Sequence, residues 1–208
     1  MANLNAPSGL SPVMYRNGNF WNGQTRLYGI ITTDTNPCYI GDVVKIDATN
    51  FADANGIPYV TRATAGATVR GVVAAVAAAL PYGYQGGPWI NPSDLTKTFR
   101  PSGAQTINYY VAVVDDPDVI FEIQEDTTST PGQAAQMTKN ANFTAANPAT
   151  GVFISGFTLN SNTYATTATL NLKVLQSIQR PDNTPYTAYQ KLHVLLNNHD
   201  FSGGIAGY

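Results

Sequence analysis

The sequence predicts an all-β fold, a single β-sandwich or barrel-like domain with an extended N-terminal arm and long loops. Short runs rich in β-branched and aromatic residues recur along the chain, and Gly, Pro, Asn and Asp separate them. Only residues 130–138 carry helix-start chemistry, with Thr130 as the expected N-cap and Pro131 at the first helical position. A helix of that length cannot organise a helical core, so strands must supply it.

The predicted strands share an apolar run that is bounded by turn residues. They are 26–32, 39–47, 58–63, 69–80, 107–115, 119–125, 152–159, 164–171, 172–179 and 189–197. The run 69–80 is rich in Ala and would also suit a helix, but its four Val residues and the glycines Gly66 and Gly71 favour a strand buried on both faces. The Asp116-Pro117-Asp118 spacing between 107–115 and 119–125 predicts a hairpin.

Residues 1–25 differ in amino-acid composition from the β-rich domain expected over 26–208. They are rich in Asn, Gly, Pro and Ser, yet they contain large apolar side chains that a purely solvating tail does not need. We expect an arm that becomes ordered by docking, either on a neighbouring subunit or on its own domain. A second irregular segment, 81–103, combines aromatic residues with glycines and prolines and predicts a long surface loop.

Composition limits the classes of partner. The 208 residues are only 12% charged, about half the usual share, and carry a formal net charge of −2. No run of Lys or Arg is available to neutralise phosphates, so a direct nucleic-acid partner is not expected. The longest apolar run, 72–80, falls well short of the roughly 20 residues that span a membrane, and the N-terminus lacks the pattern of a secretion signal. Synthesis in the cytoplasm is therefore expected.

The residues that could carry catalysis are few. Cys38 is the single cysteine, so it cannot form a disulfide within the chain, and we expect it to be a buried apolar residue. His193 and His199 are the only imidazoles, and no third ligand accompanies them in a metal-binding spacing. Gly-x-Ser-x-Gly and phosphate-loop motifs are absent. The sequence predicts a protein that is not an enzyme and has no cofactor, catalytic residue or metal site.

Acidic residues are concentrated at one place in the sequence, around Asp115, Asp116 and Asp118, with Glu122, Glu125 and Asp126 following. Paired carboxylates of this kind can serve glycoside hydrolysis, hold a surface ion or meet a basic patch on a partner. The interpretation we favour is capping, since Asp side chains beside a proline accept hydrogen bonds from turn amides.

Several stretches resemble the head decoration, or capsid cement, proteins of tailed phages. They span most of the chain and are Tyr39-Ile-Gly-Asp-Val-Val-Lys45, Asn55-Gly-Ile-Pro-Tyr-Val60, Thr64-Ala-Gly66, Gly71-Val-Val73, Val113-Val-Asp-Asp-Pro-Asp118, Phe121-Glu-Ile-Gln-Glu-Asp126, Gln179-Arg-Pro-Asp-Asn183 and Lys191-Leu-His-Val-Leu-Leu-Asn-Asn-His199. The resemblance implies a virion protein that is made in the host cytoplasm, forms small homo-oligomers, often trimers, and binds the outside of the major capsid protein lattice. It carries over no catalytic residue.

Contacts with capsid or neighbouring protomers are expected from the large apolar residues of the two irregular segments. The candidates are Leu10, Tyr15, Phe20, Trp21, Tyr82, Tyr84 and Trp89. The main alternative is a carbohydrate-binding or host-attachment module of a tail or head fibre, for which exposed aromatics and an acidic ion site are typical. A small glycosidase or esterase using the acidic turn is a further alternative. The major capsid protein itself is disfavoured, because it needs a larger chain with a long amphipathic helix.

Overall fold

The computed structural model describes residues 3–77, 98–126, 131–204 and 206–207, and the fold is all-β, as predicted. Most of its strands are short. In chain order they are β1 (Ser11–Tyr15), β2 (Arg26–Ile30), β3 (Cys38–Tyr39), β4 (Val43–Ile46), β5 (Val60–Arg62), β6 (Gly71–Ala77), β7 (Phe99–Arg100), β8 (Tyr109–Val114), β9 (Val119–Gln124), β10 (Asn140–Ala141), β11 (Phe143–Thr144), β12 (Thr158–Leu159), β13 (Leu172–Ser177) and β14 (Lys191–Leu196).

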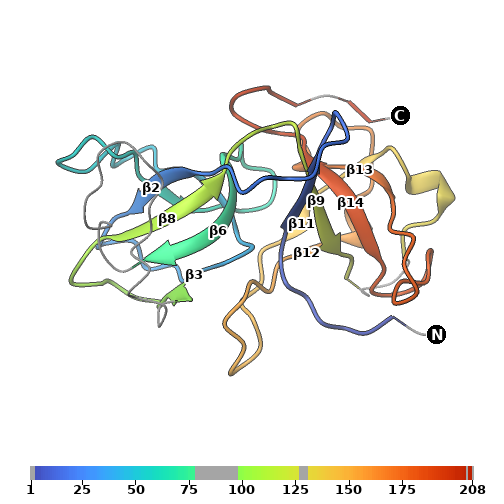
Figure 1. The fold of residues 1–208 in the computed structure, drawn as a ribbon, viewed down its shortest axis with the longest axis horizontal. Helices are drawn as coiled ribbons and strands as arrows, with labels where there is room; N and C mark the ends of the chain where they lie inside the picture. The colour runs from blue at the N-terminus through green and yellow to red at the C-terminus, as the bar shows by residue number, and fades with distance from the viewer. Residues whose placement is uncertain (1–2, 78–97, 127–130, 205, 208) are drawn as a thin grey trace.

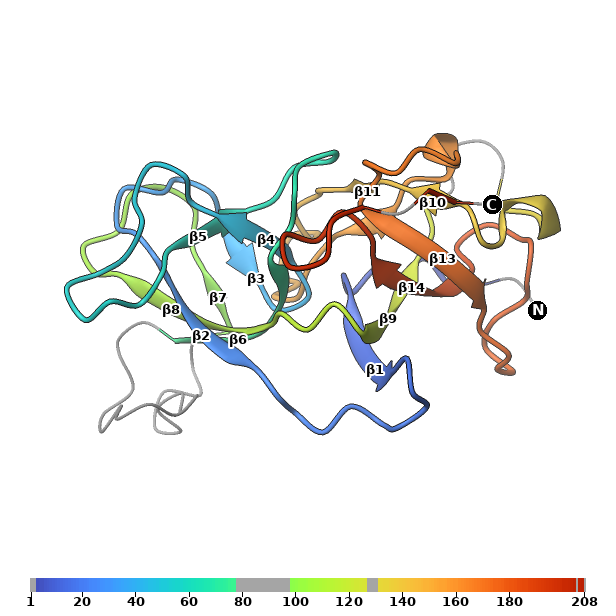
Figure 2. The ribbon, with the colours of Figure 1, turned by 90° about the horizontal axis from the view of Figure 1, so that it is seen from above.

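Two five-stranded sheets dominate the architecture, and the strand pairs within them are antiparallel. One, the barrel sheet, has the order β2-β8-β6-β4-β5, and the other, the sandwich sheet, has the order β1-β9-β14-β13-β10. The pairs β3-β7 and β11-β12 form two smaller sheets. The two large sheets lie side by side along the long axis of the molecule (Figures 1 and 2).

The barrel sheet nearly closes on itself. The backbone N–H of Gly29 in β2 donates to the carbonyl of Pro58, 2.9 Å away, and Gly29 also forms a parallel bridge with Tyr59 just before β5. A Cβ at position 29 would lie 2.8 Å from the Tyr59 ring, so only glycine allows this approach. Closure removes one exposed sheet edge and encloses a cluster of buried side chains that includes Val73, Val111 and Val113.

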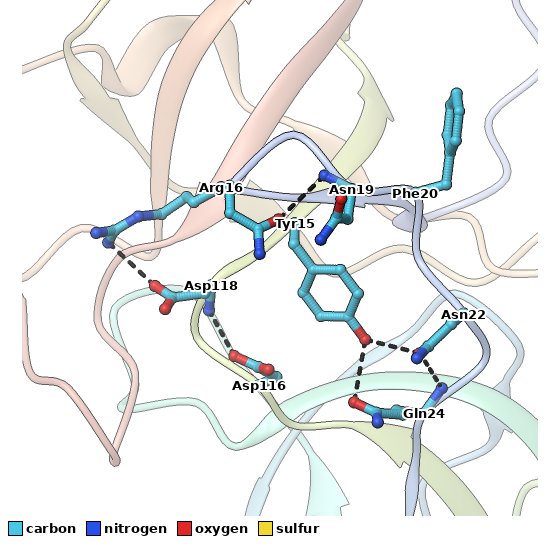
Figure 3. A pocket seen from close by; sticks show the side chains of 9 residues that line it. Tyr15, Arg16, Asn19, Phe20, Asn22, Gln24, Asp116 and Asp118 are labelled. Atoms are coloured by element: carbon cyan, nitrogen blue, oxygen red, sulfur yellow. Dashed lines mark hydrogen bonds and ion pairs between the residues drawn. The ribbon is translucent and has the colours of Figure 1, made fainter.

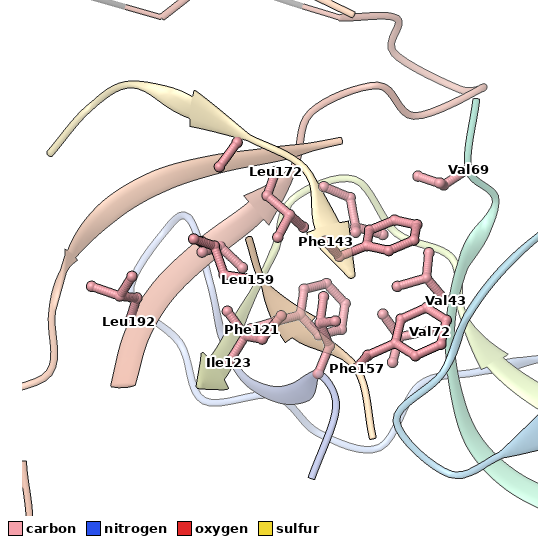
Figure 4. Close-up of a cluster of buried hydrophobic side chains, with 14 of the residues drawn as sticks. Val43, Val69, Val72, Phe121, Ile123, Phe143, Phe157, Leu159, Leu172 and Leu192 are labelled. Atoms are coloured by element: carbon pink, nitrogen blue, oxygen red, sulfur yellow. The ribbon is translucent and has the colours of Figure 1, made fainter. Parts of the chain in front are cut away.

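The sandwich sheet is covered on one face by the β11-β12 pair. Along β14, Leu192, Val194 and Leu196 are buried and alternate with partly exposed residues, which is the pattern of a half-buried strand. Phe143 of β11 and Phe157 stack with their ring centroids 5.1 Å apart above this face (Figure 4). The same cluster extends to side chains of the barrel half, Val43, Val69 and Val72 among them, so the two sheets share one hydrophobic core.

The hairpin predicted from the Asp116-Pro117-Asp118 turn is wrong. β8 lies between β2 and β6 in the barrel sheet, whereas β9 lies between β1 and β14 in the sandwich sheet. Every residue of β8 is buried, so the strand needs neighbours on both edges and cover on both faces. The turn is therefore a crossover between the two sheets, and a short connection in sequence did not determine which strands pair.

Other boundaries also differ from the sequence predictions. The run 39–47 divides at Gly41 into β3 and β4, and 152–159 retains only β12. The run 164–171 contains no strand within the part described, because turns and a single bridge at Ala165 replace it. The predicted helix is reduced to a 3-10 turn, Ala134–Gln136, and Thr130 lies outside the described residues. The strand predicted over 69–80 is present as β6, with Val72 and Val73 both buried.

The segment predicted as an arm lies, over residues 3–15, on its own domain. β1 pairs antiparallel with β9 and forms an edge of the sandwich sheet. Leu10, directly before β1, is 1% exposed and belongs to the shared core. It was predicted to contact a partner, and that prediction needs correction because the side chain is already covered. Gly9 (φ +71°) permits the crossing, since a Cβ there would lie 2.4 Å from the Gly41 carbonyl oxygen.

Candidate binding surfaces

The structure brings together two of the groups of residues singled out from the sequence. Tyr15 and Phe20, from the N-terminal segment, line a surface recess of about 520 Å³ with Asp116 and Asp118, from the crossover between the sheets. Trp21 instead packs against the shared core. The aromatic candidates of the second irregular segment, Tyr82, Tyr84 and Trp89, lie outside the described residues.

This polar recess is lined mainly by amides and carboxylates. Its remaining lining residues are Arg16, Asn17, Asn19, Asn22 and Gln24. The Tyr15 hydroxyl lies 2.9 Å from Asn22 Oδ1 and 3.2 Å from Gln24 Oε1, which fixes the orientation of the ring (Figure 3). Phe20 is 82% exposed, and its ring projects away from that of Tyr15. The recess is therefore an open, solvent-exposed depression with aromatic side chains among polar groups.

The three acidic residues have three different environments. Asp115 is buried and accepts hydrogen bonds from the Tyr28 hydroxyl at 2.7 Å and from Arg26 Nη1 at 3.1 Å, which ties the end of β8 to β2. Asp116 Oδ1 accepts the backbone N–H of Asp118 at 2.8 Å, the geometry of a capped turn. Asp118 forms an exposed ion pair with Arg16, with 3.1 Å between Nη1 and Oδ1. The three carboxylates do not converge on one point.

A second surface, which the sequence did not predict, is apolar. Val152, Phe153 and Ile154 are consecutive and are 40%, 51% and 43% exposed. Phe153 stacks on Phe99 of β7, and Phe99 stacks on Tyr39 of β3, with ring centroids 5.2 Å apart in both pairs. These five residues, Tyr39, Phe99, Val152, Phe153 and Ile154, are named the aromatic patch below.

The loop that carries the patch is held by the backbone of the domain. The Ser155 N–H donates to the Ile40 carbonyl at 2.9 Å, and Ile154 forms a bridge with Ile40. Beside this contact, an apolar recess of about 350 Å³ is lined by residues that include Ile40, Ile154, Trp21 and Pro12. The patch is therefore continuous with a hollow in the surface, and its backbone position is fixed.

A buried ion pair also fixes the loop that carries the aromatic patch to the domain. Arg62 of β5 lies with Nε 3.1 Å from Asp42 Oδ2, and the Asp42 side chain is fully buried. The guanidinium also donates to the Ala146 carbonyl at 2.6 Å and to Asn147 Oδ1 at 2.5 Å, and it lies over the Phe157 ring. Burial raises the pKa of Asp42 to about 6, against the opposing effect of Arg62. Arg62 thus connects the body to both ends of the loop.

The sequence predicts a strand over 152–159, but the glycines around Val152-Phe153-Ile154 are a local signal for a loop. Val152-Phe153-Ile154 was assigned to a strand, and in a strand alternate side chains point to opposite faces. Gly151, with φ +83°, and Gly156, where a Cβ would lie 2.7 Å from the Asn147 carbonyl oxygen, bracket the run instead. Glycines at both ends of a short apolar run indicate a tight loop that displays its side chains.

Three further titratable residues, Cys38, Glu125 and His199, are buried. Cys38 is buried, as predicted, and burial raises the pKa of its thiol. Glu125 is fully buried and accepts hydrogen bonds from Tyr164, Gln190 and the Gly132 N–H, while burial raises its pKa. His199 is also fully buried, and burial lowers its pKa. Among the residues that the structure describes, no three His, Cys, Asp or Glu side chains are grouped as a metal site requires.

Comparisons with family models, with curated proteins and with solved structures gave no match to this chain. Within the described part of the chain, no helix has the length and apolar character needed to cross a membrane.

Proposed function

We propose that the protein is a virion structural protein, a capsid decoration or cement subunit that binds the outside of the major capsid protein lattice and stabilises the phage head. Its action rests on contact area, without catalysis or a cofactor. The observation that supports this proposal best is the aromatic patch, three consecutive exposed apolar side chains that extend a stack of aromatic rings. Exposed apolar clusters of this kind mark protein contact surfaces.

The construction of the patch suits an interface. Binding loses free energy to the ordering of loops and side chains, and a loop that is ordered beforehand avoids much of that loss. Arg62 and the Ser155–Ile40 hydrogen bond supply this order here. Phe153 is half-exposed and stacks on Phe99, so a partner could cover an aromatic side chain that is already held in place, as at the centre of an interface.

The choice of capsid protein as partner rests on the sequence resemblance to tailed-phage decoration proteins. A subunit that spans two or more capsid proteins binds the assembled lattice better than it binds separated subunits, and mass action then stabilises the shell. A homotrimer would present three copies of the patch to one lattice axis and multiply this effect. Virion localisation and trimer formation belong to the proposal.

The direct test mixes the purified protein with undecorated capsids and measures co-sedimentation and the temperature of DNA release. Wild type should co-sediment and raise that temperature. The double variant Val152→Ser with Phe153→Ser should bind at least thirtyfold more weakly, which corresponds to about 2 kcal/mol. Phe51→Ser is the matched control, because Phe51 is 75% exposed and lies on the loop between β4 and β5, which contributes no residue to the patch. Absence of wild-type binding would refute the proposal.

The oligomeric state separates the two partners that the patch can have. Sedimentation equilibrium of the wild-type protein should give a trimer. If the patch binds capsid, the serine double variant stays trimeric and loses capsid binding alone. If the variant becomes monomeric, the patch is the contact between protomers, and the capsid-binding surface lies elsewhere.

A further inference from the structure

The polar recess next to β1 is separate from the aromatic patch, and none of its lining residues belongs to the patch. It lies between two chain segments that cross from one sheet to the other, residues 15–24 and the crossover at 116–118. In Figure 1 the blue segment that follows β1 lies in the upper half of the molecule, whereas the orange loop that carries the aromatic patch is at the lower edge. Trp21 alone of the segment 15–24 lines the apolar hollow beside Ile154, and the polar recess and that hollow share no lining residue. Because the two hollows have separate linings, we expect a subunit attached through the patch to leave the polar recess accessible.

The volume of the recess is within the range of about 300–1,000 Å³ that is usual for small-molecule sites, at about 520 Å³. Its lining is not that of a site for an apolar ligand. Asn17, Asn19, Asn22 and Gln24 contribute four carboxamides, and each carboxamide both donates and accepts hydrogen bonds. A ligand that matches this lining must present groups that also donate and accept, and hydroxyl groups do both.

Several of these polar groups keep capacity for a ligand. The Tyr15 hydroxyl has a single proton to share between Asn22 Oδ1 and Gln24 Oε1, and Asn22 Oδ1 also accepts the Gln24 backbone N–H, so these two side-chain oxygens are engaged. Within the described residues, the NH2 groups of Asn22 and Gln24 have no acceptor and are the donors left for a ligand. Asp116 uses Oδ1 for the turn amide, so Oδ2 is not needed for capping. Tyr15 is partly buried against the shared core and is held by its hydroxyl, so its ring is a fixed apolar surface within a polar depression.

Charge narrows the ligand class further. Arg16 carries one positive charge and pairs with Asp118, while Asp116 adds a second negative charge. The net charge of the lining is therefore −1, which disfavours phosphates, sulfates and acidic sugars. Metal-dependent recognition is not supported either, because the two aspartates are turned to a backbone amide and to Arg16.

From these features we infer that the polar recess binds an uncharged saccharide, with the pyranose ring against an aromatic side chain and its hydroxyl groups on the carboxamides and on Asp116. Phe20 extends the apolar contact at the rim, because its exposed ring has no partner in the described chain. The inference concerns the isolated subunit and is independent of capsid binding.

The test uses the purified full-length chain and two probes, a glycan array and NMR titration with glucose, galactose, N-acetylglucosamine and sialic acid. At least one neutral sugar should shift the backbone amides of residues 15–24 and 116–118, and sialic acid should not. Phe20→Ala and Asn19→Ala should each weaken that binding about tenfold. Both residues are exposed, and among the described residues Asn19 makes hydrogen bonds through its backbone alone.

Phe51→Ala is the control, since it removes an equally exposed phenylalanine from another loop. It should leave the titration unchanged. Three results would overturn the inference: no array or NMR response to any neutral saccharide, shifts that map outside the recess, or an affinity that Phe20→Ala and Asn19→Ala leave at the wild-type value. Loss of capsid binding in a separate assay would not affect any of these outcomes.

Discussion

The aromatic patch and the polar recess are both surface features, but they are built from opposite chemistry and are held in opposite ways. The patch consists of apolar side chains on a loop that a buried ion pair and backbone hydrogen bonds fix to the domain. The recess consists of amides on the segment 15–24 and carboxylates on the crossover 116–118, and the ion pair that joins the two segments, Arg16–Asp118, is exposed. The comparison teaches that one domain can fix one surface loop through buried contacts and hold another through exposed polar contacts.

The largest effect is expected from breaking the anchor of the patch. Arg62→Ala leaves the buried Asp42 carboxylate without its cation and removes the bonds to Ala146 and Asn147. Loss of one partner of a buried pair costs about 3–5 kcal/mol, which denaturant unfolding should measure.

Arg62→Lys keeps the positive charge but lacks the planar guanidinium that donates to both the Ala146 carbonyl and Asn147 Oδ1. It should fold, bind capsid more weakly and leave saccharide binding at the recess unchanged. Equal loss of both binding activities in Arg62→Lys would show that the two surfaces are not independent.

A change in the shared core should affect both surfaces together. Leu10 is buried between the segment that leads to the recess and the residues that line the apolar hollow. Leu10→Ala should lower the free energy of unfolding by about 2–5 kcal/mol. Leu4→Ala is its control, because Leu4 is 78% exposed, and it should change the unfolding curve by less than about 0.5 kcal/mol.

The pH dependence of stability sharpens the comparison, because Asp42 pairs with Arg62, which holds the loop of the patch, and does not line the polar recess. Its pKa in the folded protein is about 6, against an ordinary value of 3.8. Between these values the folded state binds more protons than the unfolded state, so this residue's contribution to stability falls as pH rises from about 4 to 6. A difference of about two pH units, at about 1.4 kcal/mol each, is at most roughly 3 kcal/mol.

Asp42→Asn removes that titration. The stability of wild type relative to Asp42→Asn should therefore decrease between about pH 4 and pH 6 in chemical unfolding experiments. A difference that stays constant over this range, or that increases with pH, would contradict the assigned pKa.

The smallest effect is expected at the recess. Arg16→Gln removes an ion pair in which both side chains are more than half exposed, and such pairs contribute about 0–1 kcal/mol. Unfolding should change little, and capsid binding should not change at all. A loss of stability above about 2 kcal/mol would show that the segment 15–24 is more strongly coupled to the core than the structure indicates.

The sequence predicted the fold class and most of the long strands, because periodic apolar runs such as those of β9, β13 and β14 record which side chains are buried. It did not predict which strands pair. β8 and β9 are separated by four residues and yet belong to different sheets, since pairing depends on contacts between segments that are distant in sequence. The strand predicted over Val152–Ile154 is wrong for a different, local reason, since Gly151 and Gly156 bracket the run and form a tight loop.

For the binding surfaces, the sequence identified Tyr15, Phe20 and the acidic turn, and the fold places them around one recess. Their proximity depends on the pairing of β1 with β9, a contact across more than a hundred residues of chain. Leu10 was misjudged because an apolar residue in a polar segment has the same sequence signal whether it meets a partner or its own core. The buried Arg62–Asp42 pair has no local signal, because its residues lie on β5 and beside β4.

The central claim is that the patch faces the capsid and the recess faces outward, and the most direct measurement is a cryo-electron microscopy map of capsids decorated with the purified protein. The account predicts that Phe153 and its neighbours contact the lattice or an adjacent protomer, with the segment 15–24 exposed to solvent. A map in which residues 15–24 and 116–118 are buried against the capsid, while Phe153 is exposed, would contradict it.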